Sequence, residues 1–76
     1  MLSACVLIRT VRGKYEEVVR SISQLKGVKR IFPVLGRYDV VVDLEASDFK
    51  ELGSVVMRMG RIFGVVFTET LLEIQC

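Results

Sequence analysis

The feature that most constrains the fold of this chain is an internal repeat with an offset of 37 residues, the separation of Gly27 and Gly64. In each half, apolar residues with helical spacing lead to a glycine, and a valine-led segment follows. The matched positions are Val18 and Val55, Val19 and Val56, Ile22 and Met59, Leu25 and Ile62, Gly27 and Gly64, and Val28 and Val65. The sequence therefore predicts two similar helix–strand units.

Each half contains one amphipathic helix. The apolar stripe of the first consists of Tyr15, Val18, Val19, Ile22 and Leu25. Gly27 is predicted to end this helix, because glycine accepts the positive φ of a C′ residue, and Lys26 then lies in the last turn. Ser47 is predicted to cap the start of the second helix. That helix ends either at Gly60 or at Gly64.

Four strands are predicted around the helices, at about 3–10, 28–35, 38–45 and 65–75. The order is βαββαβ, which defines a single α+β domain over 1–76 with a ferredoxin-like fold. Right-handed crossovers place both helices on one face of a four-stranded antiparallel sheet. The second strand becomes an edge, which suits Pro33. Gly36 and Arg37 are predicted to form a two-residue hairpin turn.

The sheet face opposite the helices is predicted to be apolar as well. In the first strand Ala4, Val6 and Ile8 point one way, whereas Cys5 and Leu7 point the other. In the last strand Val66, Leu72 and Ile74 oppose Val65, Phe67 and Leu71. An antiparallel sheet that leaves one face in water normally makes that face polar. We therefore expect the open face to be buried against a second copy of the chain.

Several functional classes are disfavoured by what the sequence lacks. It contains no histidine, so neither a Ser-His or Cys-His nucleophile nor a histidine metal site is available. The net charge of +2 is too small to indicate a nucleic-acid-binding protein, which would carry a basic stripe or a much higher charge. The longest apolar runs are too short to span a membrane. Cys5 and Cys76 are interpreted as a small core thiol and a terminal thiol, which fits a reducing cytoplasm.

Three carboxylates, Asp39, Asp43 and Glu45, share one face of the predicted third strand. Such a set could bind a hard cation or act as a catalytic pair. Alternation along a strand also produces solvated or interface-lining acids without any chemistry, and we adopt that interpretation. No catalytic residue, metal or cofactor is predicted, and we expect the chain not to be an enzyme.

Two short motifs on this frame resemble those of a known family. Gly-x-Tyr-Asp occupies 36–39, and Gly64-Val65 is followed by Thr68-Glu69-Thr70 and Leu71-Leu72. This combination resembles the effector-binding (RAM) domain of the Lrp/AsnC transcription regulators, and the resemblance runs from Ala4 to Ile74. It implies dimers that pack sheet on sheet and assemble into octamers or decamers. It also implies a small effector, usually an amino acid, bound where subunits meet.

The resemblance assigns ligand-binding positions residue by residue. Gly36, Arg37, Tyr38 and Asp39 would line one side of the pocket, and Thr68 and Thr70 would come from a neighbouring subunit. Turn N–H groups near Gly36 could reach an α-carboxylate, and Asp39 could pair with an α-ammonium. The alternative is purely structural, because a turn requires Gly36 in any case and Asp39 can bond the hairpin backbone.

The family's DNA-binding members carry an N-terminal helix-turn-helix domain, whereas this sequence starts at the first predicted strand. Met1 suggests a stand-alone version, which would act through a partner protein such as a full-length Lrp/AsnC regulator. Three alternatives stay open. They are an assembly partner that needs no ligand, a small enzyme of the dimeric α+β-barrel kind, and an ACT-like amino-acid-binding module that pairs through strand edges.

Overall fold

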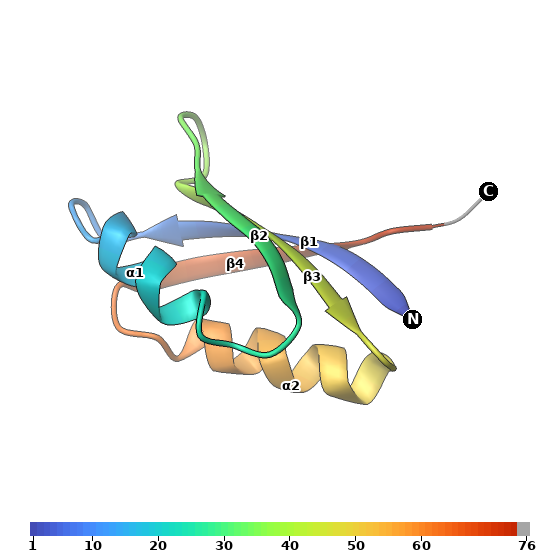
Figure 1. Cartoon of the computed structure of the whole chain (residues 1–76). Helices are drawn as coiled ribbons and strands as arrows, with labels where there is room; N and C mark the ends of the chain where they lie inside the picture. The colour runs from blue at the N-terminus through green and yellow to red at the C-terminus, as the bar shows by residue number, and fades with distance from the viewer. Residues whose placement is uncertain (75–76) are drawn as a thin grey trace.

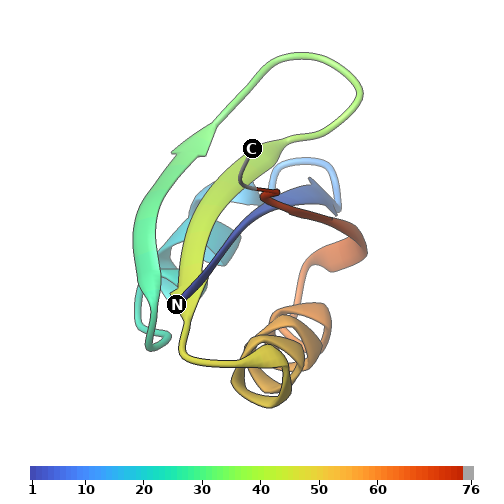
Figure 2. The same ribbon diagram turned by 90° about the vertical axis from the view of Figure 1, so that its right-hand side faces the viewer.

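Four strands and two helices make up the computed structural model, which describes residues 1–74. Their order is β1 (Leu2–Thr10), α1 (Tyr15–Ile22), β2 (Val28–Pro33), β3 (Val40–Ala46), α2 (Phe49–Gly60) and β4 (Val65–Leu72). The strands form one antiparallel sheet with the spatial order β2-β3-β1-β4. Both helices cover the same face of this sheet (Figures 1 and 2). The predicted ferredoxin-like α+β fold is confirmed, with β2 at an edge.

The core is one apolar layer between the sheet and the helices. Alternate residues of the two central strands supply its sheet side: Ala4, Val6 and Ile8 from β1, and Val40, Val42, Leu44 and Ala46 from β3. The helices supply Val18, Ile22, Leu52, Val55 and Met59. Among residues 1–74 no polar or charged side chain is buried. The helix-covered face is therefore held by apolar packing alone.

The two halves of the repeat end their helices with matching hydrogen bonds. The Leu25 amide donates to the Ile22 carbonyl at 2.9 Å, and the Ile62 amide donates to the Met59 carbonyl at 3.2 Å. These tighter bonds end α1 at Ile22 and α2 at Gly60, each followed by a short turn. The prediction that the first helix reaches Lys26 is wrong, because a separate turn carries the chain to Gly27. Of the two ends predicted for the second helix, Gly60 is the one observed.

The first turn of α2 is capped by Asp48 rather than by Ser47. The Glu51 amide donates to Asp48 Oδ1 at 2.8 Å, while the Ser47 amide donates to Glu51 Oε1 at 2.7 Å. This reciprocal arrangement satisfies two amide groups at the helix start. The bond from Ser47 lowers the pKa of Glu51, and the nearby Lys26 ammonium adds to the effect. A carboxylate one residue later in the chain thus replaces the predicted hydroxyl cap.

The connection between β2 and β3 is longer than predicted. β2 ends at Pro33 and β3 begins at Val40, so residues 34–39 form an open loop that projects from the sheet (Figure 1). The Val34 amide donates to the Asp39 carbonyl at 2.9 Å and closes the base of this loop. The prediction of a two-residue turn at Gly36 and Arg37 is therefore wrong. Leu35, which the pattern placed in a strand, is fully exposed.

Candidate functional site

Asp39 fastens the 34–39 loop to the end of β1. Its amide donates to the Ile8 carbonyl at 2.8 Å, and its carboxylate Oδ2 accepts the Thr10 amide at 2.7 Å. Asp39 therefore lies just outside β3. The sequence predicted that its carboxylate shares one strand face with Asp43 and Glu45. That prediction is wrong, because the carboxylate accepts the Thr10 amide instead. The alternative role for Asp39, a bond from its carboxylate to the backbone, is observed. The backbone group that it bonds belongs to β1, however, and not to the β2–β3 hairpin.

A surface hollow of about 420 Å³ opens beside the same loop. Its walls are Tyr15 from the start of α1, Pro33 at the end of β2, and Val34, Leu35 and Asp39 from the loop. Small-molecule sites are typically concave and largely apolar, with a few polar groups that orient the ligand. This hollow combines apolar walls with one carboxylate, a composition that suits a small ligand carrying a positive charge and an apolar group.

Tyr38 ties the loop to β4 on the open face of the sheet. Its ring stacks on Phe67, with centroids 6.5 Å apart and an interplanar angle of 21°. Its hydroxyl donates to the carboxylate of Glu69. That hydrogen bond is the main reason why the pKa of Tyr38 is raised above its ordinary value. Within one subunit, Tyr38 is thus engaged with β4 rather than with the hollow that Asp39 lines.

The bond between Tyr38 and Glu69 is expected to be visible in a titration. In a Tyr15→Phe background, where Tyr38 is the one remaining tyrosine, ultraviolet absorbance should show ionisation above the usual value of about 10. Because the folded pKa is raised, the stabilisation exists below the unfolded pKa and is lost as pH rises through the folded pKa. Glu69→Gln should move the titration back toward about 10. Glu73→Gln, just after the end of the same strand, is the matched control, and an unchanged Glu69→Gln curve would refute the assignment.

The remaining predicted ligand positions lie apart from the hollow in a single chain. Thr68 and Thr70 pair with Ile8 and Val6, so their side chains lie on the helix side of β4. β4 and β2 are opposite edges of the sheet, and the hollow lies beside the end of β2. One subunit therefore does not bring the threonines into its own hollow. Their contribution from a neighbouring subunit stays a prediction.

The two other positions of the motif lie at the exposed tip of the loop. Gly36 has a φ of +142°, a value that favours glycine, and a Cβ atom there would meet nothing within 4 Å. The backbone shape of the loop thus requires Gly36, while the space around it stays open to a ligand or a neighbouring subunit. Arg37 is exposed beside it, and its contact with a ligand also stays a prediction.

The carboxylates of β3 pair with bases of the neighbouring edge strand. Glu45 lies 3.3 Å from the Lys29 ammonium, and Asp43 lies 3.9 Å from the Arg30 guanidinium. Over residues 1–74 there is no group of three or more His, Cys, Asp or Glu side chains that could hold a metal ion. These pairs explain the acids as charge partners of β2, in line with the structural interpretation.

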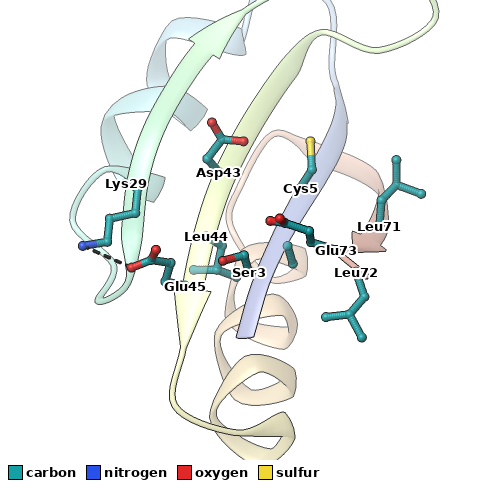
Figure 3. Close-up of a pocket in the computed structure, with 10 residues that line it drawn as sticks. Ser3, Cys5, Lys29, Asp43, Leu44, Glu45, Leu71, Leu72 and Glu73 are labelled. Carbon is teal, nitrogen blue, oxygen red and sulfur yellow. Dashed lines mark ion pairs between the residues drawn. The ribbon is translucent and has the colours of Figure 1, made fainter. Parts of the chain in front are cut away.

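A second hollow, of about 480 Å³, lies on the open face near the start of β1 (Figure 3). Cys5 and Asp43 lie along it, with Leu71 and Glu73 on the β4 side. Cys5 is half-buried here, and burial is the main cause of its raised pKa. The prediction that Cys5 is a core thiol is therefore wrong, because odd-numbered residues of β1 face away from the helices. Cys76 lies outside the described residues.

The open face is apolar at its centre, as the sequence predicted. Phe67 and Leu71 of β4 are 52% and 48% exposed. They share this face with Leu7 and Val41, which pair across the two central strands and are half-buried.

Neither helix in residues 1–74 is long and apolar enough to cross a membrane.

The fold and the loop define a small α+β domain with a largely apolar hollow beside residues 34–39. A model of the "Lrp/AsnC ligand binding domain" matches residues 3–75. The chain belongs to this family, as its motifs had indicated.

Known proteins support this assignment. The chain is 31% identical over 72 residues to the HTH-type transcriptional regulator FL11 of Pyrococcus abyssi, covering 95% of this chain and 48% of the relative. It thus spans about half the length of the curated regulators it matches. The crystal structure of TTHA0845 from Thermus thermophilus superposes with a TM-score of 0.94 at 34% identity, covering 100% of this chain and 96% of that one.

Two further matches share part of this sequence or its fold. A 58-residue stretch, 76% of this chain, is 34% identical to a portion of the homocitrate synthase of Sulfurisphaera tokodaii that makes up 13% of that protein. The regulator NMB0573 from Neisseria meningitidis, solved as a complex with L-Met, has a TM-score of 0.87 at 17% identity. That match covers 97% of this chain and 50% of the regulator. At this identity the likeness shows the fold alone.

Proposed function

We propose that this chain is a non-enzymatic regulatory module that binds an amino acid or a similar small effector at the 34–39 loop. The observation that carries the proposal is the Asp39 carboxylate, which lines an apolar hollow while its backbone and side chain fix the loop to β1. A carboxylate on a rigid support is a suitable partner for the α-ammonium of an amino acid.

The rest of the hollow and loop supplies complementary chemistry. Pro33 and Leu35 offer apolar contact for an aliphatic side chain, and Tyr15 offers an aromatic surface. Amide groups around Gly36 can approach an α-carboxylate closely, because no Cβ atom stands in the way. The hollow is open to one side, so a neighbouring subunit would complete it with the Thr68 and Thr70 hydroxyls.

The proposal includes assembly through the open sheet face. Apolar side chains such as Phe67 and Leu71 are too exposed there for a face that remains in water. A second copy packed on this face gives the homodimer, and dimers joined at their loops give an octamer or decamer. Such an assembly would work in the cytoplasm, without a cofactor, and would modulate transcription through a full-length Lrp/AsnC regulator. The complex of NMB0573 with L-Met supports an amino acid as the first ligand class to test.

A thermal-shift screen over the standard amino acids tests this function. Wild-type protein should gain about 5 °C or more with at least one amino acid at ten times its Kd, because a ligand that binds only the folded state stabilises it. Asp39→Asn keeps an acceptor for the Thr10 amide but removes the charge, so it should lose most of this gain.

Asp48→Asn is the matched control, since Asp48 also accepts a backbone amide through its carboxylate and lies outside the loop. It should respond to the amino acid as the wild type does. The proposed function fails if no amino acid shifts the wild-type melting temperature. It also fails if Asp39→Asn responds as strongly as Asp48→Asn.

A further inference from the structure

The outer face of α2 exposes two large apolar side chains among its polar residues. A helix that covers a sheet normally buries one stripe and presents polar residues to water on the other side. α2 instead exposes Phe49 and Met57, at 67% and 61%. They lie eight residues apart on one stripe, with Gly53 halfway between them. The stripe faces away from the core residues Leu52, Val55 and Met59 of the same helix.

Gly53 is a costly residue at this position. In a helix interior glycine is less favourable than alanine by roughly 1 kcal/mol. A Cβ atom at Gly53 would meet nothing within 4 Å, and its φ lies outside the left-handed region. The fold itself therefore does not require glycine here. A helix backbone approached closely from outside would require it, because any side chain would hold the neighbour away.

The surroundings of Gly53 form a basic groove of about 480 Å³. Phe49 and Met57 are its large apolar lining residues. Its charged lining consists of Lys50, Arg58 and Arg61, and no carboxylate of residues 1–74 lines it. Two copies of α2 packed across a two-fold axis would bring these cations together, so the groove is poorly matched to itself. Its charge is complementary to an acidic occupant.

We propose that this groove docks an acidic amphipathic helix from a partner protein. A small or apolar residue of that helix would pack over Gly53 between Phe49 and Met57, and flanking carboxylates would pair with Lys50, Arg58 and Arg61. This surface lies on the helix side of the sheet, opposite the face proposed for the dimer (Figure 2). It goes beyond the proposed function, since it needs neither the effector nor the open face.

The test uses two synthetic helical peptides of about 20 residues with the same Leu and Ala stripe. One carries Glu on both flanks of the stripe and the other carries Lys. Fluorescence anisotropy at about 50 mM salt, where screening is modest, should show the Glu peptide binding the wild-type protein at least tenfold more tightly than the Lys peptide. Gly53→Leu should weaken the Glu peptide by at least tenfold, since the new side chain fills the groove.

Gly53→Leu should not unfold the protein, because leucine is the better helix former and meets open space. Ser21→Leu, which adds the same side chain at an exposed position of α1, is the matched control and should bind like the wild type. The proposal is overturned if the Glu peptide does not bind, binds no better than the Lys peptide, or binds Gly53→Leu unchanged. It is also overturned if Gly53→Leu alone changes the sedimentation of the protein, because a second copy would then occupy the groove.

Discussion

Gly27→Ala is expected to lower the free energy of unfolding by about 3 kcal/mol or more, a large part of the stability of a domain this small. Gly27 has a φ of +92°, which disfavours any side chain, and a Cβ atom there would overlap the Glu45 carbonyl oxygen. That carbonyl belongs to β3, whose backbone cannot move without disturbing the central sheet. The Gly27 carbonyl in turn accepts the Glu45 amide at 2.9 Å, so relief of the clash would also strain this bond.

Alanine variants at two other glycines separate the cost of the clash from the cost of the positive φ. Gly13 has a φ of +81° and open space around it, so Gly13→Ala should cost only about 1–2 kcal/mol. Gly64, the repeat partner of Gly27, would place a Cβ atom 3.1 Å from a Val18 methyl group, and its alanine variant should fall between the two. Urea denaturation measures all three. If Gly27→Ala and Gly13→Ala lowered the free energy of unfolding equally, the close approach of Gly27 to β3 would contribute nothing to the destabilisation.

Leu71→Glu is expected to weaken the proposed dimer by at least a hundredfold. Burial of a leucine side chain is worth about 1.5–3 kcal/mol, and a two-fold dimer loses that contribution twice. The substitution also brings two carboxylates onto a face that already carries Glu69 of the same strand. The stability of the single subunit should change little, because Leu71 faces away from the helix-covered core. Analytical ultracentrifugation over a range of concentrations gives the dissociation constant.

Phe63→Glu is the control for this substitution. Phe63 is exposed and apolar, but it lies in the turn between α2 and β4 rather than on the open face. The variant introduces the same charge and should leave the dimer intact. A Leu71→Glu protein that sediments like the wild type would mean that the open sheet face is not the dimer interface.

Most of the fold could be predicted because it depends on local periodicity. The alternation in β1 and β3 and the helical stripe through Val18 and Ile22 each define one buried face. The repeat then set the order of the elements, and Gly27 and Gly64 do precede β2 and β4 with positive φ. These features follow from side-chain spacing along the chain, which is directly legible in a sequence.

The loop could not be predicted because its shape depends on residues far away in sequence. Asp39 is held by Thr10 of β1, and Tyr38 is held by Phe67 and Glu69 of β4. Nothing in the local pattern reveals these contacts. A prediction based on alternation alone therefore assigned residues at both ends of the loop to the flanking strands. The motif did identify the segment that forms a hollow. It did not reveal Tyr15 and Pro33 as walls of that hollow, since they come from other elements.

The capping of α2 shows a smaller error of the same kind. Ser47 and Asp48 are both good N-cap residues, and sequence preference does not distinguish them. The backbone decides, because Asp48 is extended and its carboxylate reaches the Glu51 amide, whereas the Ser47 amide is taken by the Glu51 side chain. The start of such a helix depends on the residue at which the preceding strand ends, here Ala46 of β3.

The most direct test of the central claim is a crystal structure of the protein grown with the amino acid that gives the largest thermal shift. We predict electron density for that amino acid beside the 34–39 loop, with its α-ammonium on the Asp39 carboxylate and with Thr68 or Thr70 of a neighbouring subunit in contact. A ligand bound elsewhere, or a fully formed assembly whose loops hold no amino acid, would contradict the account.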